Sequence, residues 1–464
     1  MRVLLVSTYE LGHQPLHVAS PAARLRAAGH DVVALDLAVE EYDPARVAAC
    51  DAVAISVPMH TAMRLGVEVA RRLRSEHPDK PIAFYGLYAA VGRDPAVGAV
   101  ADHAFVGEYE PALVTWVRAL EGAGSSPPVV VDVGKTEFLV PARDVLPPLD
   151  RYARLEVGGE QRIAGYVEAS HGCRHRCRHC PVPVIYDGRL RTVAVDVTVA
   201  DVAQQVEMGA RHISFGDPDF LNAPVHARRV IDAVHATFPD LTFDLTVKVS
   251  HILEFGYWEE LARRNTLFVI SAFESTDDRT LRLLDKGHTA ADMTRSVEIL
   301  RREGIEIRPT WLPFVPWTDV GHLRDMFSFI ADHDLFGATD PVQMGLRLLL
   351  PAGSLLLELE EIGSRIGPYD PDALTHPWTN PDPSVDDLQR RLADLAADGA
   401  DRGTPVLETL AEQWRAVLEA SGEDPGRAVI RHPRPVPRLT ESWFCCAEPT
   451  ELQRDRVGTS GCGC

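Results

Sequence analysis

Short apolar runs alternate with amphipathic stretches over residues 1–122. Strands buried on both faces of a parallel sheet read as nearly continuous apolar runs, whereas a surface helix repeats its apolar residues every three or four positions. The predicted strands are Val3–Ser7, Val32–Leu37, Ala52–Val57 and Ile82–Tyr85. The predicted helices are Pro21–Ala28, Pro44–Cys50, Thr61–Ser75 and Glu110–Leu120. This order predicts an α/β domain with a doubly wound, Rossmann-like sheet.

A second strand–helix alternation covers residues 162–350. Its predicted strands are Tyr166–Ala169, His212–Phe215, Phe243–Val247, Leu267–Ala272, Ile305–Pro309 and Val342–Leu349. Its predicted helices are Val199–Met208, Val225–Thr237, Trp258–Arg264, Ala290–Glu303 and Val320–Asp332. About six such units fit a partial (βα)6 barrel, in which the active site forms at the C-terminal rim of the strands.

The chain between and after these alternations differs in composition. The stretch from Glu121 to Arg151 is rich in Gly, Ser and Pro, which predicts a linker, placed at residues 123–161. Residues 351–440 are charged and predicted helical, with clear amphipathic patterns at Val385–Leu395 and Leu407–Ala420. Residues 441–464 form a cysteine-rich tail that ends in small polar residues, and we expect it to be mobile.

Charge and cysteine usage narrow the class of protein. The chain has 67 acidic and 47 basic residues, a net charge of −20, which argues against a nucleic-acid-binding surface. No apolar run approaches the roughly 20 residues that span a membrane, and the first residues lack a signal-peptide pattern. Eight cysteines in such a chain indicate ligands and reactive thiols rather than disulfides. We therefore expect a cytoplasmic enzyme without nucleic-acid or membrane partners.

Three cysteines in one short loop carry the strongest chemical signal. Cys173, Cys177 and Cys180 are separated by three and then two residues. Thiolates at this spacing can ligate three irons of a [4Fe–4S] cluster and leave the fourth iron open. A structural zinc loop and a ferredoxin-type cluster are the alternatives, but no nearby cysteine completes the four ligands that zinc usually takes.

The Cys-x3-Cys-x2-Cys loop resembles the signature of the radical S-adenosylmethionine (SAM) superfamily. The resemblance implies a [4Fe–4S] cluster whose open iron binds the amino and carboxylate groups of SAM. It also implies a reducing electron donor, such as flavodoxin or ferredoxin, and cleavage of a carbon–sulfur bond of SAM. His179 takes the place of the aromatic residue that usually precedes the third cysteine in this family.

The same resemblance suggests residues that hold SAM. Phe215–Phe220 ends the second predicted barrel strand, where the family places its SAM-amine motif, so Gly216 and Asp217 are the candidates there. Phe273-Glu274-Ser275 resembles the Glu-Ser motif that contacts SAM. The remaining candidates are cations for a carboxylate, Lys248 and Arg308 or Arg347, and Tyr186 as a wall beside the cluster. A turn at Gly216-Asp217 and surface salt bridges for the cations are the structural alternatives.

The N-terminal region resembles the cobalamin-binding-type domain of other radical SAM enzymes, through its element order and the phrase Leu11–Leu16. The usual Asp-x-His-x-x-Gly loop is absent, and His13 lies in the corresponding loop. Many relatives bind cobalamin without that histidine, and a loop histidine is equally able to be structural. The sequence therefore leaves cobalamin as a cofactor open.

Half of the cysteines lie in the tail, at Cys445, Cys446, Cys462 and Cys464. Adjacent cysteines and a Cys-x-Cys pair make a chelating thiol set for a soft, thiophilic centre. A pyramidal set of three thiolates suits trivalent arsenic. A second iron–sulfur site, a zinc site and a redox pair are the alternatives.

The string Cys-Cys-Ala-Glu-Pro resembles the tail of the CUAEP/CCAEP group of radical SAM proteins, whose members are associated with arsenic chemistry. The resemblance implies an arsenite 3-amino-3-carboxypropyltransferase of the arsinothricin-pathway type, which forms a C–As bond and releases methylthioadenosine. Cys445 and Cys446 then bind arsenite and act in catalysis, with Cys462 or Cys464 as a further ligand. The alternatives are a cobalamin-dependent radical SAM methyltransferase of natural-product biosynthesis and a non-catalytic metalloid sensor.

Overall fold

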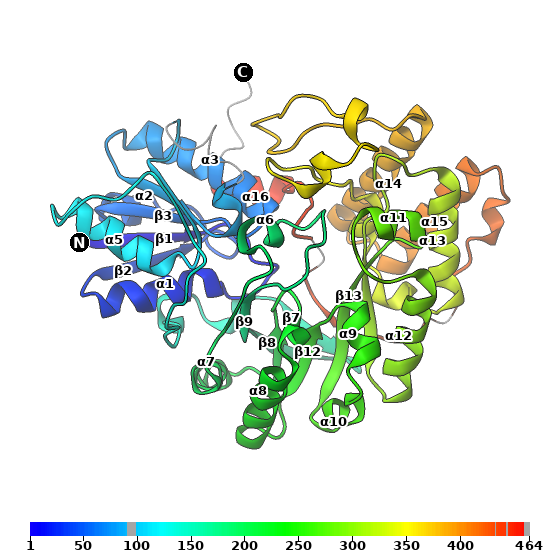
Figure 1. The fold of residues 1–464 in the computed structure, drawn as a ribbon, viewed down its shortest axis with the longest axis horizontal. Coiled ribbons are helices and arrows are strands. Elements are labelled where there is room, and N and C mark those ends of the chain that lie inside the picture. The colour runs from blue at the N-terminus through cyan, green and yellow to red at the C-terminus, as the bar shows by residue number, and fades with distance from the viewer. Residues whose placement is uncertain (91–98, 432, 442–443, 459–464) are drawn as a thin grey trace.

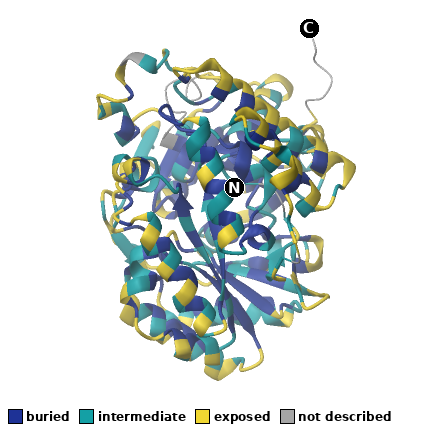
Figure 2. Ribbon diagram, turned by 90° about the vertical axis from the view of Figure 1, so that its right-hand side faces the viewer, coloured by how far each residue is buried: buried dark blue, intermediate teal, exposed yellow. Residues whose placement is uncertain are grey.

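The computed structural model describes residues 1–90, 99–431, 433–441 and 444–458. Two sheets stand side by side, and the C-terminal helices lie on the far side of the second sheet (Figure 1). Buried residues concentrate along the strands, and exposed ones cover the outer helix faces (Figure 2).

The first sheet has six parallel strands in the order β2-β1-β3-β4-β5-β6. The strands are β1 Arg2–Ser7, β2 Asp31–Asp36, β3 Ala52–Ser56, β4 Ile82–Tyr85, β5 His103–Gly107 and β6 Val129–Asp132. The helices are α1 Leu16–Ala27, α2 Pro44–Ala48, α3 His60–Glu76 and α5 Glu110–Leu120. Separate apolar cores cover the two faces, with Ile55 and Phe84 in one and Ala54 and Tyr85 in the other. The predicted Rossmann-like sheet is confirmed.

Three elements of this domain differ from the prediction. Strand β5 was not predicted. Helix α1 begins at Leu16, so Pro21 lies inside it rather than at its start. Proline is common at the first helical position, which misplaced the predicted boundary. Strand β6 lies within residues 123–161, the predicted linker, and pairs in parallel with β5. It is a half-exposed edge strand directly after Pro127 and Pro128, so its composition resembles that of a loop.

The second sheet has the order β14-β13-β12-β11-β8-β7-β15, and the five strands from β14 to β8 are parallel. Its strands are β7 Arg154–Val157, β8 Glu160–Val167, β11 His212–Phe215, β12 Thr242–Thr246, β13 Thr266–Glu274, β14 Glu306–Trp311 and β15 Arg438–Leu439. The helices along it are α7 Val195–Glu207, α8 Pro224–Thr237, α9 Val249–Glu254, α10 Trp258–Arg263, α11 Asp278–Leu283, α12 Ala290–Arg302 and α13 Val320–Asp332.

The sixth predicted strand, Val342–Leu349, is wrong. Residues Pro341–Gly345 form a 3-10 turn, and one parallel bridge between Phe314 and Arg347 follows. Gly345 packs against the backbone of Ala393 so closely that a Cβ atom on it would lie 2.7 Å from Ala393 Cα. Helix α14 Pro383–Arg402 therefore covers this edge of the barrel instead of a further strand.

The C-terminal helices share the barrel core. Helices α14 Pro383–Arg402 and α15 Val406–Ala420 bury Leu392 and Val417 in the same cluster as Phe327 of α13. The chain then pairs β15 with β7 and continues to α16 Glu451–Val457, which lies beside α3 of the first domain (Figure 1). The described part of the tail is thus docked rather than extended.

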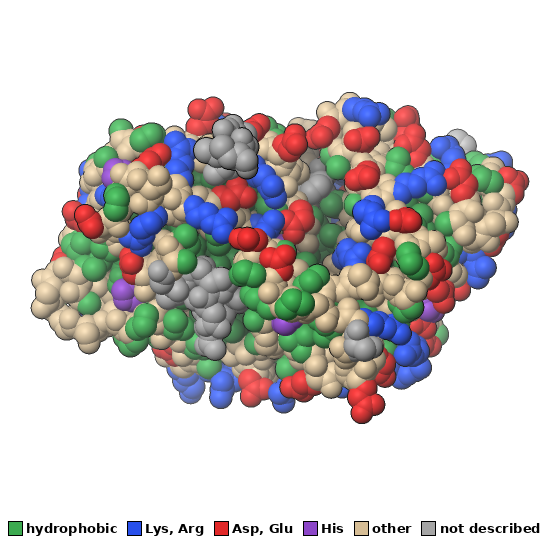
Figure 3. All heavy atoms as spheres, turned by 90° about the horizontal axis from the view of Figure 1, so that it is seen from above, with side chains coloured by type: hydrophobic (Ala, Val, Ile, Leu, Met, Phe, Trp, Pro, Cys, Tyr) green, Lys and Arg blue, Asp and Glu red, His purple; other side chains and the backbone are tan. Residues whose placement is uncertain are grey.

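Among the residues that the structure describes, none of the helices is long and apolar enough to cross a membrane. Acidic and basic side chains are interspersed over the face that carries α3 and α14 (Figure 3).

The guanidinium of Arg143 joins the two domains. Its side chain is fully buried and makes a paired contact with Asp201 of α7, with both N–O distances at 2.9 Å. It also donates to the carbonyls of Gln14, in the loop after β1, and Tyr166, on β8. Because these bonds satisfy the buried charge, Arg143 fixes the loop after β1 against the barrel.

We expect Asp201→Ala to lower the free energy of unfolding by about 3–5 kcal/mol, because it leaves the buried Arg143 charge unpaired. Asp144→Ala is the matched control. It removes an exposed pair with Arg26 and should change the free energy of unfolding by less than about 1 kcal/mol. Thermal unfolding of the three proteins checks this, and equal midpoints would contradict the role of Arg143.

Candidate active site

The cysteine loop lies at the carboxyl end of the first barrel strand. Strands β9 Ser170–Gly172 and β10 Leu190–Thr192 pair in antiparallel fashion and enclose it, together with helix α6 Val182–Tyr186. Gly172 has a φ of +77°, and a Cβ atom there would lie 2.4 Å from the carbonyl oxygen of Arg189. Only glycine fits this crossing, which brings the two ends of the loop together.

Cys173, Cys177 and Cys180 line one cavity of about 160 Å³. Burial raises the pKa of the Cys180 thiol to about 12 and also raises that of Cys173. Such thiols lose their protons when a metal binds, because the ligand is the thiolate. Three soft ligands around one cavity, with the fourth position left to a small molecule, fit an open [4Fe–4S] cluster.

Glu274 is the last residue of strand β13, and it lines this cavity beside the cysteine loop. It has a φ of +64° at an irregularity of the β13–β14 register, a strained conformation for a residue other than glycine. Its Oε1 atom lies 3.1 Å from His179 Nε2 and 3.2 Å from the buried Lys286 ammonium. Burial alone would raise the pKa of Glu274, but the Lys286 charge and the contacts of His179 lower it to about 2. Glu274 is thus held as a carboxylate.

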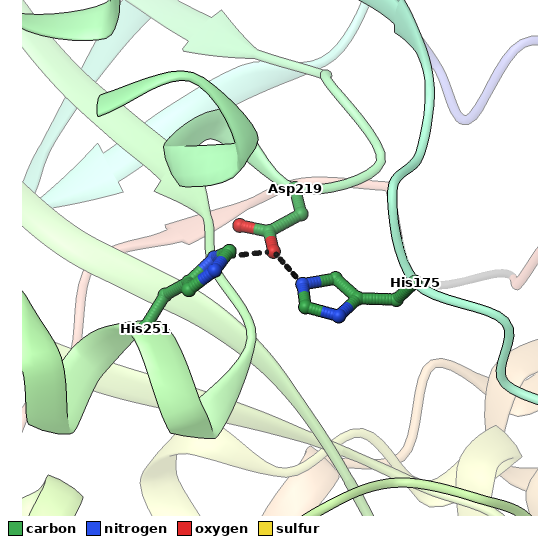
Figure 4. A group of neighbouring side chains, drawn as sticks. All are labelled: His175, Asp219 and His251. Atoms are coloured by element: carbon green, nitrogen blue, oxygen red, sulfur yellow. Dashed lines mark ion pairs between the residues drawn. The ribbon is translucent and has the colours of Figure 1, made fainter. Parts of the chain in front are cut away.

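Asp219 is a second buried carboxylate in this cavity (Figure 4). Its Oδ2 atom lies 3.3 Å from His175 Nε2 and 2.7 Å from His251 Nδ1. Burial opposes ionisation, but the contacts with His175 and His251 lower the pKa of Asp219 to about 2. Lys248 Nζ lies 3.2 Å from His175 Nδ1, and because an ammonium can only donate, Nδ1 accepts and the His175 proton faces Asp219.

Gly216 and Asp217, the predicted SAM-amine motif, do not line the cavity. The Asp217 carboxylate accepts hydrogen bonds from the Ala169 amide and the Ser170 hydroxyl, which fixes the start of the cluster loop. Gly216 allows a close approach, but of Tyr166, whose Oη atom would lie 2.0 Å from an added Cβ.

The other predicted cations do not reach the cavity. Arg308 pairs with Asp340 at 2.8 Å, and Arg347 pairs with Asp386 at the same distance and covers the ring of Trp378. Lys248 does line the cavity. Ser275 follows Glu274, and its hydroxyl accepts a hydrogen bond from the Asp277 amide.

Tyr186 lies behind the cysteine loop. Its hydroxyl donates to Glu108 of the first domain at 3.1 Å. It therefore connects the loop to the first domain and is not among the residues that line the cavity.

The tail brings Cys445 and Cys446 to the junction of the two domains. Their Sγ atoms lie 3.6 Å apart. The hydrogen bond with Cys445 and burial raise the pKa of Cys446, and the charge of Glu274 contributes to the rise. Burial raises the pKa of Tyr88, and the charges of Cys446, Cys445 and Cys180 contribute. Both sets of thiols thus act on one side chain. Cys462 and Cys464 lie outside the described residues.

Asp219, His251 and Lys286 are site residues that the sequence reasoning missed. Asp219 is the second carboxylate of the predicted SAM-amine motif, and strand alternation could not have separated it from Asp217, because residues two positions apart share one face of a strand. His251 and Lys286 follow the third and fourth barrel strands, where rim residues gather. A search of those loops for polar residues would have found them.

Residues 167–327 match the radical SAM superfamily. Among solved structures, the chain is similar to the cobalamin-dependent S-adenosylmethionine radical enzyme OxsB with aqua-cobalamin bound, with a TM-score of 0.67 and 15% identity, over 89% of this chain and 68% of OxsB. With S-adenosylmethionine also bound, OxsB gives a TM-score of 0.66 and 15% identity, over 91% of this chain and 70% of OxsB.

The chain is also similar to the radical S-adenosylmethionine methyltransferase TsrM from Kitasatospora setae with cobalamin and a [4Fe–4S] cluster bound. That match has a TM-score of 0.60 and 18% identity, over 79% of this chain and 76% of TsrM. At these identities the similarity shows the fold. A search of curated proteins finds no match.

The protein therefore carries a radical SAM domain over residues 167–327. This confirms the predicted [4Fe–4S] cluster and SAM as cofactors, and it implies a reductant.

Burial raises the pKa of Asp217 to about 7, so the folded protein favours its protonated form. The stability that this proton adds is complete below the ordinary pKa of aspartate, and it is lost as the pH rises through about 7. Asp217→Asn stays neutral. We expect the thermal midpoint of the wild type to fall relative to that of Asp217→Asn between pH 5 and pH 8. A constant difference would contradict the buried titration.

Proposed function

We propose that the protein transfers the 3-amino-3-carboxypropyl group of SAM to arsenite. When bound, a reduced [4Fe–4S] cluster supplies the electron that breaks a carbon–sulfur bond of SAM. In this reaction that bond is the one to Cγ of the methionine moiety. SAM, arsenite, two electrons and one proton give methylthioadenosine, the trivalent organoarsenical and water. The cluster's donor provides both electrons, one for bond cleavage and one after the C–As bond forms.

The observation that carries this proposal is the position of the vicinal thiols. Cys445 and Cys446 are adjacent in sequence and in space, and the charge of Glu274 on the cavity wall influences Cys446. Neighbouring thiolates are ligands for a soft, thiophilic centre. A metalloid held by this pair is presented towards the side of the cavity where Glu274 and the cluster loop meet.

Three charged groups on the cavity wall suit the charges of SAM. Asp219 and Glu274 are both held as carboxylates, and either can receive the SAM ammonium through a charge-assisted hydrogen bond. Lys248 contacts His175, which in turn contacts Asp219. The Lys248 ammonium can bind the SAM carboxylate. Asp217 instead positions the cluster loop in this assignment.

A second cavity offers a route for the acceptor. It has a volume of about 790 Å³ and lies between helix α14 and the tail residues Cys446–Glu451. Cys446 lines this cavity, so a metalloid in the cavity can reach the thiol pair through Cys446.

We expect Cys445→Ser and Cys446→Ser to lower arsenic transfer at least 100-fold while the iron content per chain stays unchanged. The reason is that a hydroxyl replaces the soft ligand without touching the cluster cysteines. Inductively coupled plasma mass spectrometry of the product and of the reconstituted protein measures both quantities.

Cys50→Ala is the matched control, because Cys50 is a buried cysteine of the first domain and lies in its apolar core. It should retain transfer. Full transfer by the Cys445→Ser, Cys446→Ser double variant would show that the tail thiols do not hold the acceptor.

A radical SAM methyltransferase is the second candidate, favoured by the similarity to TsrM over 79% of this chain. The two candidates differ in the bond of SAM that breaks. Methyl transfer gives S-adenosylhomocysteine with 5′-deoxyadenosine, or S-adenosylhomocysteine alone, whereas aminocarboxypropyl transfer gives methylthioadenosine.

We expect the reduced, reconstituted enzyme to convert SAM to methylthioadenosine when arsenite is present, with an arsenic-bearing aminocarboxypropyl product in equal amount. Anaerobic incubation with and without arsenite, followed by mass spectrometry of the nucleosides, checks this. S-adenosylhomocysteine as the main product would favour the methyltransferase, and failure to cleave SAM would contradict both candidates.

A further inference from the structure

In open α/β sheets, ligands bind in the crevice outside the carboxyl ends of the strands, at the point where the strand order reverses. In the first domain this point lies between β1 and β3, because β2 lies on one side of β1 and β3 lies on its other side. The loop after β1 and the first turn of α3 form the two sides of the crevice. Thr8 joins them, because its hydroxyl donates to the Ala62 carbonyl at 3.1 Å.

The protein's own tail occupies the α3 side of this crevice. The Thr61 amide donates to the carbonyl of Cys445, at 3.3 Å. The Thr61 hydroxyl lies 2.8 Å from the carbonyl oxygen of Ala447 and 3.1 Å from that of Cys445. A helix N-terminus normally offers its free amides to a ligand. Here the tail backbone accepts one of them.

Side chains add a second layer of contacts. Glu448 pairs with the buried His60 at 3.2 Å and with Arg64 at 3.0 Å, both on the first turns of α3. Further along, Arg72 of α3 donates to the Val457 carbonyl, at 3.0 Å. Val457 is 1% exposed and belongs to the apolar core of the first domain. The tail is therefore anchored at both ends of its docked segment.

The β1 side of the crevice is turned towards the barrel. His13 is buried, and its ring packs at a tilt against that of Tyr166 of β8, with centroids 4.7 Å apart. The Gln14 side chain donates to the Pro147 carbonyl, at 2.9 Å. The histidine that the sequence left as a cobalamin candidate thus packs against the second domain instead of facing an open crevice.

The cavity on the β2 side of this loop, lined by Gly12 of the loop and by Ala38 and Val39 after β2, is small for a corrinoid. It has a volume of about 420 Å³, and the tail residues Glu441, Gln453 and Arg456 contribute to its wall. Drug-sized ligands already need about 300–1,000 Å³, and a corrinoid with its nucleotide is larger than these. The residues at this edge do not fit cobalamin while the tail is docked.

We propose that the tail is the resident occupant of the Rossmann-like crevice, and that the domain holds the vicinal thiols there in place of a corrinoid. Tail docking and corrinoid binding at this crevice exclude one another. The inference rests on the contacts of the tail and does not require arsenite to be the acceptor.

Two measurements on the full-length, cluster-loaded protein test this without SAM or arsenite. In the first, the protein is incubated with hydroxocobalamin and desalted, and the retained corrinoid is measured by absorbance. We expect essentially none to be retained. Retention of about one corrinoid per chain would overturn the proposal.

The second measurement follows alkylation of Cys445 and Cys446 by N-ethylmaleimide with peptide mass spectrometry. Thr61→Val removes the hydroxyl beside the tail carbonyls and should raise the alkylation rate about tenfold, because the lost hydrogen bonds favour undocking. Thr115→Val, on the outer face of α5, is the matched control and should leave the rate unchanged. Equal rates in the wild type and Thr61→Val would overturn the docking role.

The two outcomes are separable from the proposed transfer reaction. A protein that retains no corrinoid and releases its tail in Thr61→Val, but yields no arsenic product, would keep this inference and contradict arsenite transfer. Arsenic transfer by a protein that retains a corrinoid would do the reverse.

Discussion

The paired hydrogen bonds of Arg143 determine how the two sheets face one another. One buried guanidinium touches the loop after β1, strand β8 and helix α7, so it reaches three elements of two domains. Because the chain cannot leave such a charge unsatisfied, the carboxyl ends of both sheets are held towards a common junction. The cluster loop, the Glu274 wall and the tail thiols all lie at this junction.

The contacts of two buried carboxylates then shape the cavity itself. Glu274 is matched by Lys286 and His179, and Asp219 by His175 and His251. Each carboxylate remains ionised in a buried place because its partners are built into the surrounding loops. The strained backbone of Glu274 costs about 1–3 kcal/mol and persists because these partners hold it. The cavity is thus prepared for a ligand that carries both an ammonium and a carboxylate.

Local sequence patterns were sufficient to predict much of the fold. The apolar runs at β1, β3 and β4 and the spacing of Cys173, Cys177 and Cys180 are visible without tertiary information. Strand β6 was not predicted because its half-exposed residues follow two prolines. The prediction of a sixth barrel strand was wrong because helix α14 covers that edge of the barrel. The choice between Asp217 and Asp219 depends on how the chain turns after β11, which composition does not reveal.

Docking of the tail could not be predicted from the sequence for a different reason. The contact between Thr61 and Ala447 joins residues separated by 386 positions. Closing so long a loop adds little entropic cost per residue, but the loop can close only after the docked tail has been synthesised. Domains fold in order of synthesis, so the first sheet forms well before its occupant exists. The crevice therefore stays accessible during synthesis until residues 445–457 emerge and dock on α3.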